Sequence, residues 1–222
     1  MMACGATLQL LAGCQDQLST LHPAGPSAAT IAEIWWIMLA GSVAILALVM
    51  GLLTAALLRR PDSPDEPERA GLWLWTLGLA FPLIVLAALT VYGLKIGERL
   101  LPREAPDVVT VTAEARQWAW SFGYADAPGL ATEDILHIPA GRPVDVRITS
   151  LDVVHSFWVP RLAGKLDALP GHVNVLRIEA PVAGTYAGQS AEFSGPGYLG
   201  HVFTVQAHDP AAWDQFLAEG AP

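Results

Sequence analysis

The chain has 222 residues, of which 53% are hydrophobic and only 15% are charged, and its formal net charge is −9. This balance fits one compact domain joined to membrane segments better than two soluble domains. The negative charge argues against a nucleic-acid partner. Both cysteines, Cys4 and Cys14, lie near the start of the sequence, so the rest of the chain can form neither a disulfide nor a thiolate-ligated metal site.

The beginning of the chain carries a short processing motif. In "LLAGC", Leu10–Cys14, small residues precede the cysteine, as a lipoprotein signal peptidase requires, and Cys14 would become the lipidated first residue. No Lys or Arg precedes the motif, so a fortuitous cysteine near an unprocessed end is the alternative. Proline and glycine in the following "HPAGPSA" indicate a loop. Residues 1–30 are therefore interpreted as a lipoprotein-type N-terminal segment and loop.

Two uncharged runs of 25 residues follow, Ile34–Leu58 and Ala70–Leu94. At a rise of 1.5 Å per residue each run covers about 37 Å, more than the roughly 30 Å hydrocarbon core of a bilayer. Residues 31–97 are predicted to form a transmembrane helical hairpin, in which Pro82 is tolerated. Three arginines in the connector, residues 59–69, place it in the cytoplasm. The remainder of the chain then lies in the periplasm, outside a bacterial inner membrane.

The pattern changes over residues 106–208 to short alternating runs rich in β-branched residues and bounded by Pro, Gly or Asp. Strands at this spacing predict an antiparallel β-sandwich or barrel of about 100 residues. Residues 209–222 are predicted to form a C-terminal helix and tail. Pro210 suits the first position of that helix, and Trp213 and Phe216 lie on one of its faces.

Four motifs of the predicted sandwich resemble those of a known family: "RQWAWSF", "DVVHSFWVP", "KLDALPG" and "GQSAEFSGPGYLGH". Together with the lipobox and the hairpin, they resemble subunit II of the haem-copper respiratory oxidases over essentially the whole chain. The resemblance implies a two-helix transmembrane hairpin followed by a cupredoxin-like antiparallel β-sandwich. It also implies that subunit I, the catalytic subunit, and subunit III are partners within the lipid bilayer. Haems and copper are then expected in the catalytic subunit.

In the copper-binding members of that family, the sandwich holds a dinuclear copper centre that receives electrons from cytochrome c. Its ligands are a histidine of the "HSFWVP" segment and, within one loop, Cys, Glu through its backbone carbonyl, Cys, His and Met. This chain keeps the first histidine and the glutamate and replaces the other four ligands. The matching positions are His155, Ser190, Glu192, Ser194, Tyr198 and His201.

The replaced residues decide what this loop can bind. Two bridged copper ions need soft thiolates, whereas serine hydroxyls stay protonated and hard at neutral pH. We therefore expect no metal, no other cofactor and no catalytic residue in this chain. A weak hard-metal site of His155, Glu192 and His201 is the alternative to former ligands that hydrogen-bond one another or water.

The segment "SGPGY", Ser194–Tyr198, resembles the copper-free subunit II of the bo-type ubiquinol oxidases, where quinol reacts at the catalytic subunit. The sequence thus predicts subunit II of a proton-pumping terminal oxidase that reduces oxygen to water with ubiquinol as donor. His155, Glu192 and "KLDALPG" resemble the copper-binding subunits instead, which leaves open a copper-free subunit fed by cytochrome c or another carrier. A non-enzymatic periplasmic binding module is a further alternative.

Three further residues receive roles from the resemblance. Trp118 and Trp120 match an aromatic pair that lies near the metal and the cytochrome c docking surface in copper-binding members. Because the two tryptophans share one face of a predicted strand, core packing is the favoured reading. Glu68 is the nearest match to a glutamate that helps protons enter from the cytoplasm in related subunits, and its alternative is a solvated loop charge.

Overall fold

The computed structural model describes residues 17–58, 66–103 and 105–219, with the side chains of residues 66–69 excepted. The chain divides into two compact units. One unit is residues 34–100, and the other joins the segment up to residue 33 to everything from residue 101 onward. Cys14 lies outside the described residues, so its lipidation stays a prediction from the sequence.

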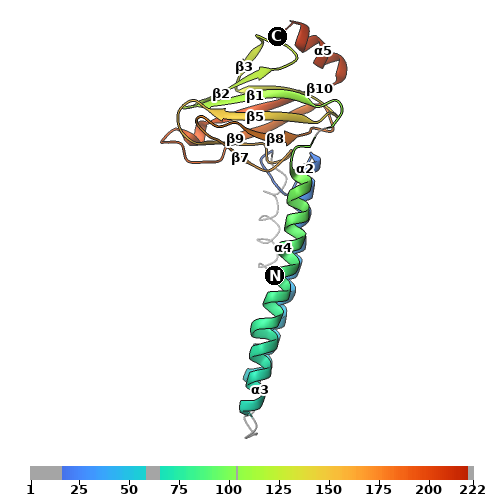
Figure 1. Cartoon of the computed structure of the whole chain (residues 1–222), viewed down its shortest axis with the longest axis vertical. Coiled ribbons are helices and arrows are strands. Elements are labelled where there is room, and N and C mark those ends of the chain that lie inside the picture. The colour runs from blue at the N-terminus through green and yellow to red at the C-terminus, as the bar shows by residue number, and fades with distance from the viewer. Residues whose placement is uncertain (1–16, 59–65, 104, 220–222) are drawn as a thin grey trace, which may run out of the picture. The chain divides into compact units, whose positions relative to one another are not determined.

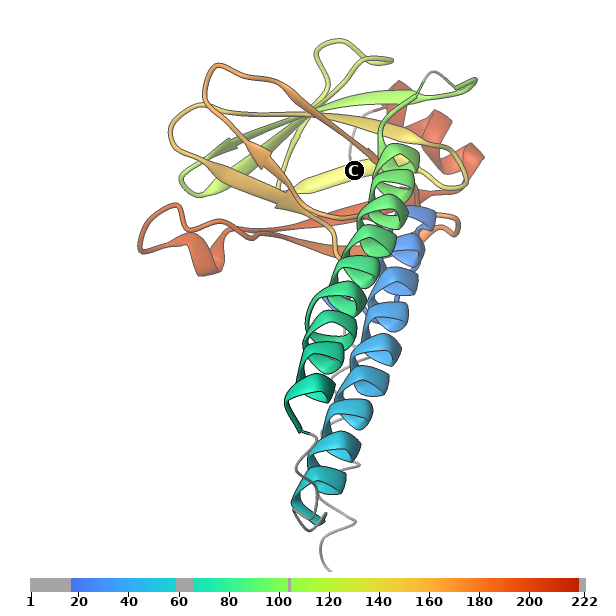
Figure 2. The same cartoon turned by 60° about the horizontal axis from the view of Figure 1, so that its bottom comes forward.

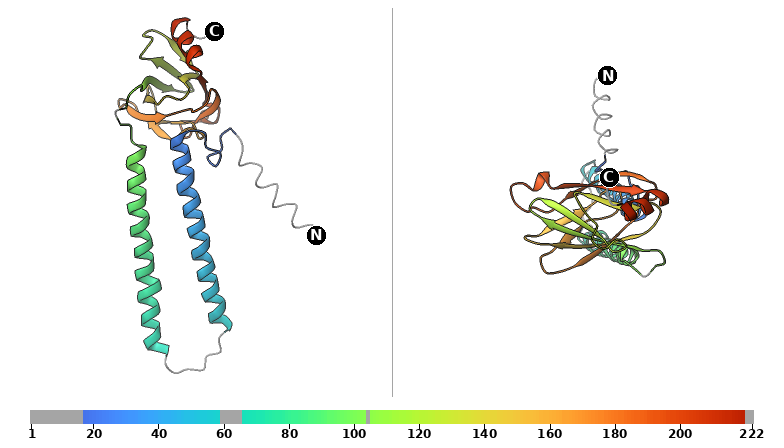
Figure 3. Two further views of the ribbon diagram at one scale, coloured as in Figure 1. Left: turned by 90° about the vertical axis from the view of Figure 1, so that its right-hand side faces the viewer. Right: turned by 90° about the horizontal axis from the view of Figure 1, so that it is seen from above.

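Two long helical stretches make up the first unit and run in opposite directions (Figures 2 and 3). One is α2 (Pro26–Leu58), and the other joins α3 (Glu66–Trp73), η2 (Leu74–Ala80) and α4 (Phe81–Leu100). Their most apolar windows have mean hydropathies of 2.4 and 2.2 and contain no buried residue. Both helices are long and apolar enough to cross a bilayer.

The first helix begins at Pro26, which lies within the loop predicted for residues 1–30. Proline is favoured at the first helical position because its missing N–H would have no partner there. The helix is then fixed by its first turns: Ala28 and Ala32 are buried, and the Ala28 N–H donates to the Leu162 carbonyl at 3.2 Å. Packing against the sandwich therefore extends the helix beyond its uncharged run.

The second helix widens into the π-helix η2 directly before Pro82. Proline has no backbone N–H, and its ring crowds the carbonyl four residues earlier. In the π turn the Phe81 N–H reaches back five residues to the Thr76 carbonyl. This wider turn accommodates the proline without ending the helix.

The second unit contains two five-stranded sheets that pack face to face (Figure 1). Their strand orders are β3-β2-β1-β5-β8 and β4-β10-β9-β6-β7. The first sheet comprises β1 (Val109–Arg116), β2 (Ala119–Tyr124), β3 (Ala131–Glu133), β5 (Val144–Ser150) and β8 (Asn174–Ile178). The second comprises β4 (Ile135–Pro139), β6 (His155–Trp158), β7 (Leu166–Ala168), β9 (Gly184–Ser190) and β10 (Val202–His208). The predicted β-sandwich is confirmed.

The sheets are mixed, so the predicted antiparallel arrangement is wrong in one respect. Strand β1 pairs with β5 in parallel, and β10 pairs with β4 in parallel. The other ladders are antiparallel. Alternating hydrophobicity reports which face of a strand is buried, and it carries no information on the direction of the neighbouring strand.

The core lies between the sheets and becomes aromatic toward one end. Every second residue of β1 is buried, as the sequence alternation predicts. From β2, Trp120 meets Phe157 of β6 with 5.6 Å between ring centroids, and Phe203 of β10 at 5.5 Å. Burying a Phe side chain stabilises the fold by roughly 1.5–3 kcal/mol. These rings join the two sheets beside the loop that connects β9 to β10.

The C-terminal helix α5 (Pro210–Glu219) covers the opposite end of β4 and β10. Phe216 of the helix stacks on His137, with ring centroids 4.3 Å apart and planes 10° apart. Beneath it, His137 Nδ1 and His208 Nε2 lie 2.7 Å apart, so one ring nitrogen donates a proton to the other. The helix therefore packs on a pair of imidazoles that are hydrogen-bonded to each other.

This histidine pair predicts a loss of stability in mild acid. Burial, followed by repulsion from His208, lowers the pKa of His137 to about 4, and burial lowers the pKa of His208 against the partial compensation of Asp209. The unfolded chain takes up these protons near pH 6.5. Stability from the neutral pair is therefore complete above about pH 6.5 and is lost as the pH falls toward 4.

We expect the free energy of unfolding of the detergent-purified chain to fall by roughly 1–2 kcal/mol between pH 7 and pH 5. His137→Phe keeps a ring against Phe216 and should reduce this dependence. His172→Gln changes an exposed histidine and should leave it unaltered. An unchanged pH dependence in His137→Phe would contradict the assignment.

Candidate functional site at the loop end of the sandwich

Neighbouring strands of the second sheet bring the first two predicted site residues together. Strands β6 and β9 pair with Phe157 opposite Ser190, and the Ser156 N–H approaches Ser190 Oγ at 3.4 Å. The loop that leaves β9 returns to it, since the Ser190 N–H donates to the His201 carbonyl at 2.9 Å. His155, Ser190 and His201 therefore lie at one end of the sandwich.

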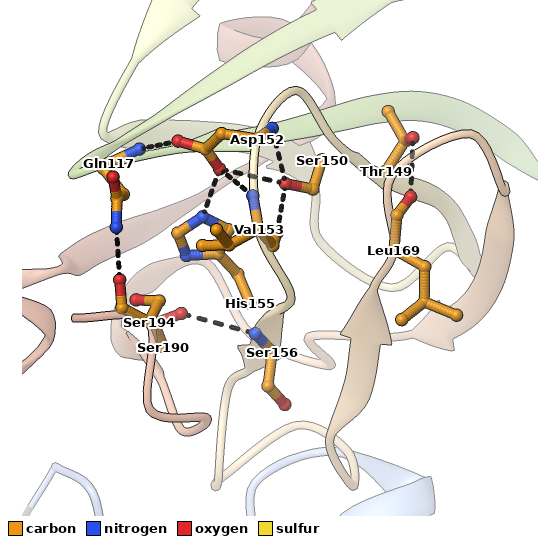
Figure 4. Close-up of polar contacts among 10 residues, drawn as sticks. All are labelled: Gln117, Thr149, Ser150, Asp152, Val153, His155, Ser156, Leu169, Ser190 and Ser194. Carbon is orange, nitrogen blue, oxygen red and sulfur yellow. Dashed lines mark hydrogen bonds and ion pairs between the residues drawn. The ribbon is translucent and has the colours of Figure 1, made fainter.

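His155 is fully buried and is oriented by a carboxylate. Its Nε2 lies 2.8 Å from Asp152 Oδ1 (Figure 4). Burial alone would raise the pKa of Asp152, but hydrogen bonds from His155, Val153 and Gln117 outweigh that effect and lower the pKa to about 2. The ionised carboxylate can only accept, so Nε2 carries a proton. In the neutral ring, Nδ1 then keeps its lone pair, and it has no hydrogen-bond partner among the described residues.

His201 is buried next to His155, with ring centroids 4.9 Å apart and planes at 80°. It also stacks on Trp120 at 5.3 Å and 20°. Burial lowers the pKa of His201, and contact with the backbone of Ala119 offsets this only in part. The ring is therefore neutral at physiological pH, and neither nitrogen forms a hydrogen bond of normal geometry within the described part of the chain.

The two serines complete the buried cluster. Ser190 is 6% and Ser194 is 5% exposed. The Ser194 carbonyl accepts a hydrogen bond from Gln117 Nε2 (Figure 4), whereas its hydroxyl has no partner in the described residues. The buried side-chain atoms without a partner there are Trp120 Nε1, His155 Nδ1, Ser156 Oγ, Ser194 Oγ and both ring nitrogens of His201. Buried polar atoms of this kind usually bind ordered water.

The other two predicted positions make different contacts. The Glu192 carboxylate pairs with Lys165 at 3.6 Å, and both side chains are about half exposed. Tyr198 lies in the short helix η3 (Tyr198–Gly200) and packs against Phe193 with ring centroids 5.2 Å apart. Four of the six positions therefore form one buried cluster, and the side chains of Glu192 and Tyr198 do not join it.

The two tryptophans are placed differently from each other. Trp120 is fully buried, as core packing predicts, but Trp118 is 42% exposed, so its predicted burial is wrong. Trp118 lies in the turn between β1 and β2, where strand alternation does not apply. A Cβ atom on Gly197 would come within 2.6 Å of the Trp118 ring, which shows how closely the loop after β9 covers this side chain.

Asp152 is the residue that the sequence analysis missed. It stands three residues before His155 in "DVVHSF", and it orients the histidine as a carboxylate often orients a metal-ligating imidazole. The sequence feature that could have identified Asp152 is an acidic residue three positions before a candidate histidine. Glu68 lies in α3, but its side chain is outside the described part of the structure, so its role stays a hypothesis.

The donor set does not fit a dinuclear copper centre. The two positions that must supply bridging thiolates carry hydroxyls, which stay protonated and bind soft metals poorly. Tyr198 and His201 replace the remaining imidazole and thioether. The cluster orients two neighbouring imidazoles, and nothing in its chemistry supports a one-electron carrier of the blue or dinuclear copper type.

Comparison with known proteins gives concordant matches. The family model described as cytochrome c oxidase subunit II, periplasmic domain, matches residues 127–205. A quinol oxidase subunit 2 from Bacillus cereus is 33% identical over 96% of this chain and 76% of its own length. A cytochrome c oxidase subunit 2 from Alkalihalophilus pseudofirmus is 32% identical over 93% of this chain and 64% of its own length.

Among solved structures, the periplasmic domain of subunit II of cytochrome oxidase from Bradyrhizobium japonicum is 21% identical, covering 54% of this chain and 96% of that domain, with a TM-score of 0.49. The family assignment rests on the sequence relatives, and above all on the Bacillus cereus protein, because the match spans nearly the whole of this chain. The chain belongs to the subunit II family of the haem-copper oxidases, as a membrane-anchored member whose β-sandwich is the periplasmic domain of that family.

Proposed function

We propose that this chain is a copper-free, non-catalytic subunit II of a proton-pumping terminal oxidase. The oxidase reduces oxygen to water with electrons from a membrane quinol, and the proposed quinol is ubiquinol. One observation carries the proposal: Ser190 and Ser194 present buried hydroxyls at the two positions where copper-binding members have thiolates. With no redox centre in the sandwich, electrons must enter elsewhere in the complex. A quinol dissolved in the bilayer can reach the catalytic subunit directly.

Sequence relatives support a quinol donor. The proteins from Bacillus cereus and Staphylococcus aureus are named as a quinol oxidase subunit 2 and a probable quinol oxidase subunit 2, at 33% and 26% identity. Identity alone does not separate the branches, because the cytochrome c oxidase subunit 2 from Alkalihalophilus pseudofirmus is 32% identical. The replaced ligands discriminate between them on chemical grounds.

A second candidate function is a copper-free subunit II that still serves an oxidase fed by cytochrome c or another carrier. The observation in its favour is the exposed ring of Trp118, at the position that the family resemblance connects with cytochrome c docking. The partners are the same in either case: subunits I and III in a bacterial inner membrane, with this sandwich in the periplasm. Lipidation of Cys14 and proton entry near Glu68 belong to the same proposal.

The donor is tested by oxygen uptake. The purified complex should consume oxygen rapidly with ubiquinol and only at background rate with reduced cytochrome c, because the sandwich offers no copper centre to accept an electron. An oxygen electrode measures both rates on the same preparation. Rapid uptake with cytochrome c and none with quinol would transfer the assignment to the second candidate.

The replaced ligands predict the metal content. Copper in the purified complex should be accounted for by the catalytic subunit, without the near-infrared and paramagnetic signals of a dinuclear copper centre. Ser190→Cys, Ser194→Cys, Tyr198→His and His201→Met together should restore a purple copper centre, since the spacing is unchanged and the thiolates return. The introduced methionine can also occupy the place of His201 against Trp120, because thioethers pack well on aromatic rings.

A matched variant carries only Tyr198→His and His201→Met. It restores the imidazole and the thioether but leaves both serines, so it should stay without a dinuclear copper signal. Stoichiometric copper bound by the unmodified subunit would contradict the proposal and remove its main support.

Membrane orientation is tested with a reporter that is active only in the periplasm. Fused after Ala207, at the end of the sandwich, the reporter should be active, and fused at Asp65 in the arginine-containing connector it should be inactive. The reverse pattern would place the sandwich in the cytoplasm and overturn the proposed localisation.

A further inference from the structure

The segment before the first membrane helix is held against the sandwich by one arginine. The Arg161 carbonyl accepts the Ala24 N–H at 2.7 Å. Its side chain donates from Nε to the His22 carbonyl at 3.0 Å and from Nη1 to Gln17 Oε1 at 3.4 Å. Arg161 therefore fixes residues 17–25, which we call the N-terminal strap, at both ends.

The strap is closely seated at its junction with α2. A Cβ atom on Gly25 would lie 2.6 Å from the carbonyl oxygens of both Glu179 and Leu162. Only glycine permits this approach of backbone to backbone. The strap and the first turns of α2 belong to the same compact unit as the sandwich, so their position on it is defined by these contacts.

An apolar groove of about 420 Å³ runs beside the strap. It is lined by Thr20, Ala28, Ile31, Trp158, Pro160, Ala163, Gly164, Lys165 and Ala191. Apart from the indole N–H of Trp158, the polar side chains among them are those of Thr20 and Lys165. Lys165 is paired with Glu192 at 3.6 Å, so this part of the groove carries little net charge.

The chain itself offers an occupant. Cys14 stands three residues before Gln17, and three residues span at most about 10 Å. Gln17 contacts Arg161, whose neighbour Pro160 lines the groove. We propose that the groove binds a fatty acyl chain of the diacylglyceryl group on Cys14, an inference that rests on the proposed lipidation of this residue.

The chemistry of the groove fits this occupant better than a membrane phospholipid. The apolar walls match a hydrocarbon chain, and the Thr20 hydroxyl and Lys165 ammonium can donate hydrogen bonds to an ester carbonyl. A phosphate group would favour an unpaired cation, whereas Lys165 is already paired with a carboxylate. The ester groups of a lipidated cysteine are uncharged and need no unpaired cation.

An acyl chain in this groove gives the lipid a role other than membrane attachment. Two membrane-spanning helices already anchor the chain, so a lipid that served only as a tether would add little. Bound in the groove, it packs against Ile31 of the first helix and Trp158 of β6 at once. It therefore fixes the N-terminal strap and the start of α2 on the sandwich.

Photochemical cross-linking in the assembled complex tests this inference. Cells are grown with a fatty acid that carries a diazirine, the complex is purified and irradiated, and adducts are located by mass spectrometry. We expect acyl adducts on the peptides that contain Ile31 or Trp158. Cys14→Ala should abolish these adducts because it removes the covalent source of the chain.

A second variant fills the groove without touching the lipidation site. A Cβ atom on Gly164 would lie 3.3 Å from Ile31 Cδ1, so Gly164→Leu places its side chain in the groove. The variant should lose the adducts while the intact mass still shows a lipidated Cys14. Gly200→Leu is the matched control, since a Cβ atom there meets nothing within 4 Å, and it should keep the adducts.

Three other outcomes would contradict the proposal that an acyl chain on Cys14 occupies the groove. Adducts that persist in Cys14→Ala would show that a membrane lipid fills the groove. A lipidated wild-type chain without adducts at the groove would show that the acyl chain lies elsewhere, and an unlipidated wild-type chain would remove the occupant altogether. The quinol and copper measurements are independent of all three results, so failure here is distinguishable from failure of the quinol-oxidase assignment.

Discussion

Packing around the Trp120 ring is the interaction on which the candidate site depends. The ring is fully buried and lies within 6.5 Å of the rings of Phe122, Phe157, Phe203 and both site histidines, between centroids. Aromatic pairs contribute about 0.5–1.5 kcal/mol each beyond the burial of their area. The tryptophan, itself on the sheet opposite β6, supplies the contact that the two site histidines share.

The cluster around Trp120 nevertheless keeps features of a ligand site. Asp152 fixes the tautomer of His155, and His201 stacks on Trp120. A buried polar atom without a partner costs about 1–3 kcal/mol, so six such atoms would severely destabilise a dry site. Water is the simplest way to remove that cost. The cluster is thus a set of buried polar groups enclosed by aromatic rings, and their unpartnered atoms are the ones that ordered water would satisfy.

Sequence patterns were sufficient for features that depend on local periodicity. Uncharged length predicts the two helices, and alternation along β1 predicts its buried face. Sequence patterns failed for features that depend on contacts between residues far apart in the chain. Trp118 leaves the core because a turn interrupts the alternation, and α2 starts at Pro26 because Leu162, far along the chain, accepts a hydrogen bond from its first turn. His137 and His208, 71 residues apart, could be paired only once β4 and β10 were known to be neighbours.

The ligand positions show the same limit at the scale of single residues. The family resemblance predicted six positions for one site, and four of them, His155, Ser190, Ser194 and His201, have buried side chains. The resemblance could not predict that the Glu192 side chain would turn to Lys165.

This last contact links the candidate copper-loop site to the groove. Strand β6 carries His155 at one end and the groove residue Trp158 at the other. Ala191, another groove residue, donates its N–H to the Ser156 carbonyl at 3.2 Å. Glu192 follows directly, and its pair with Lys165 reaches the groove. The Glu192 carboxylate thereby offsets the charge of Lys165, which lines the groove. Strand β6 and the residues that follow Ser190 therefore contribute both to the buried cluster and to the groove proposed for the acyl chain.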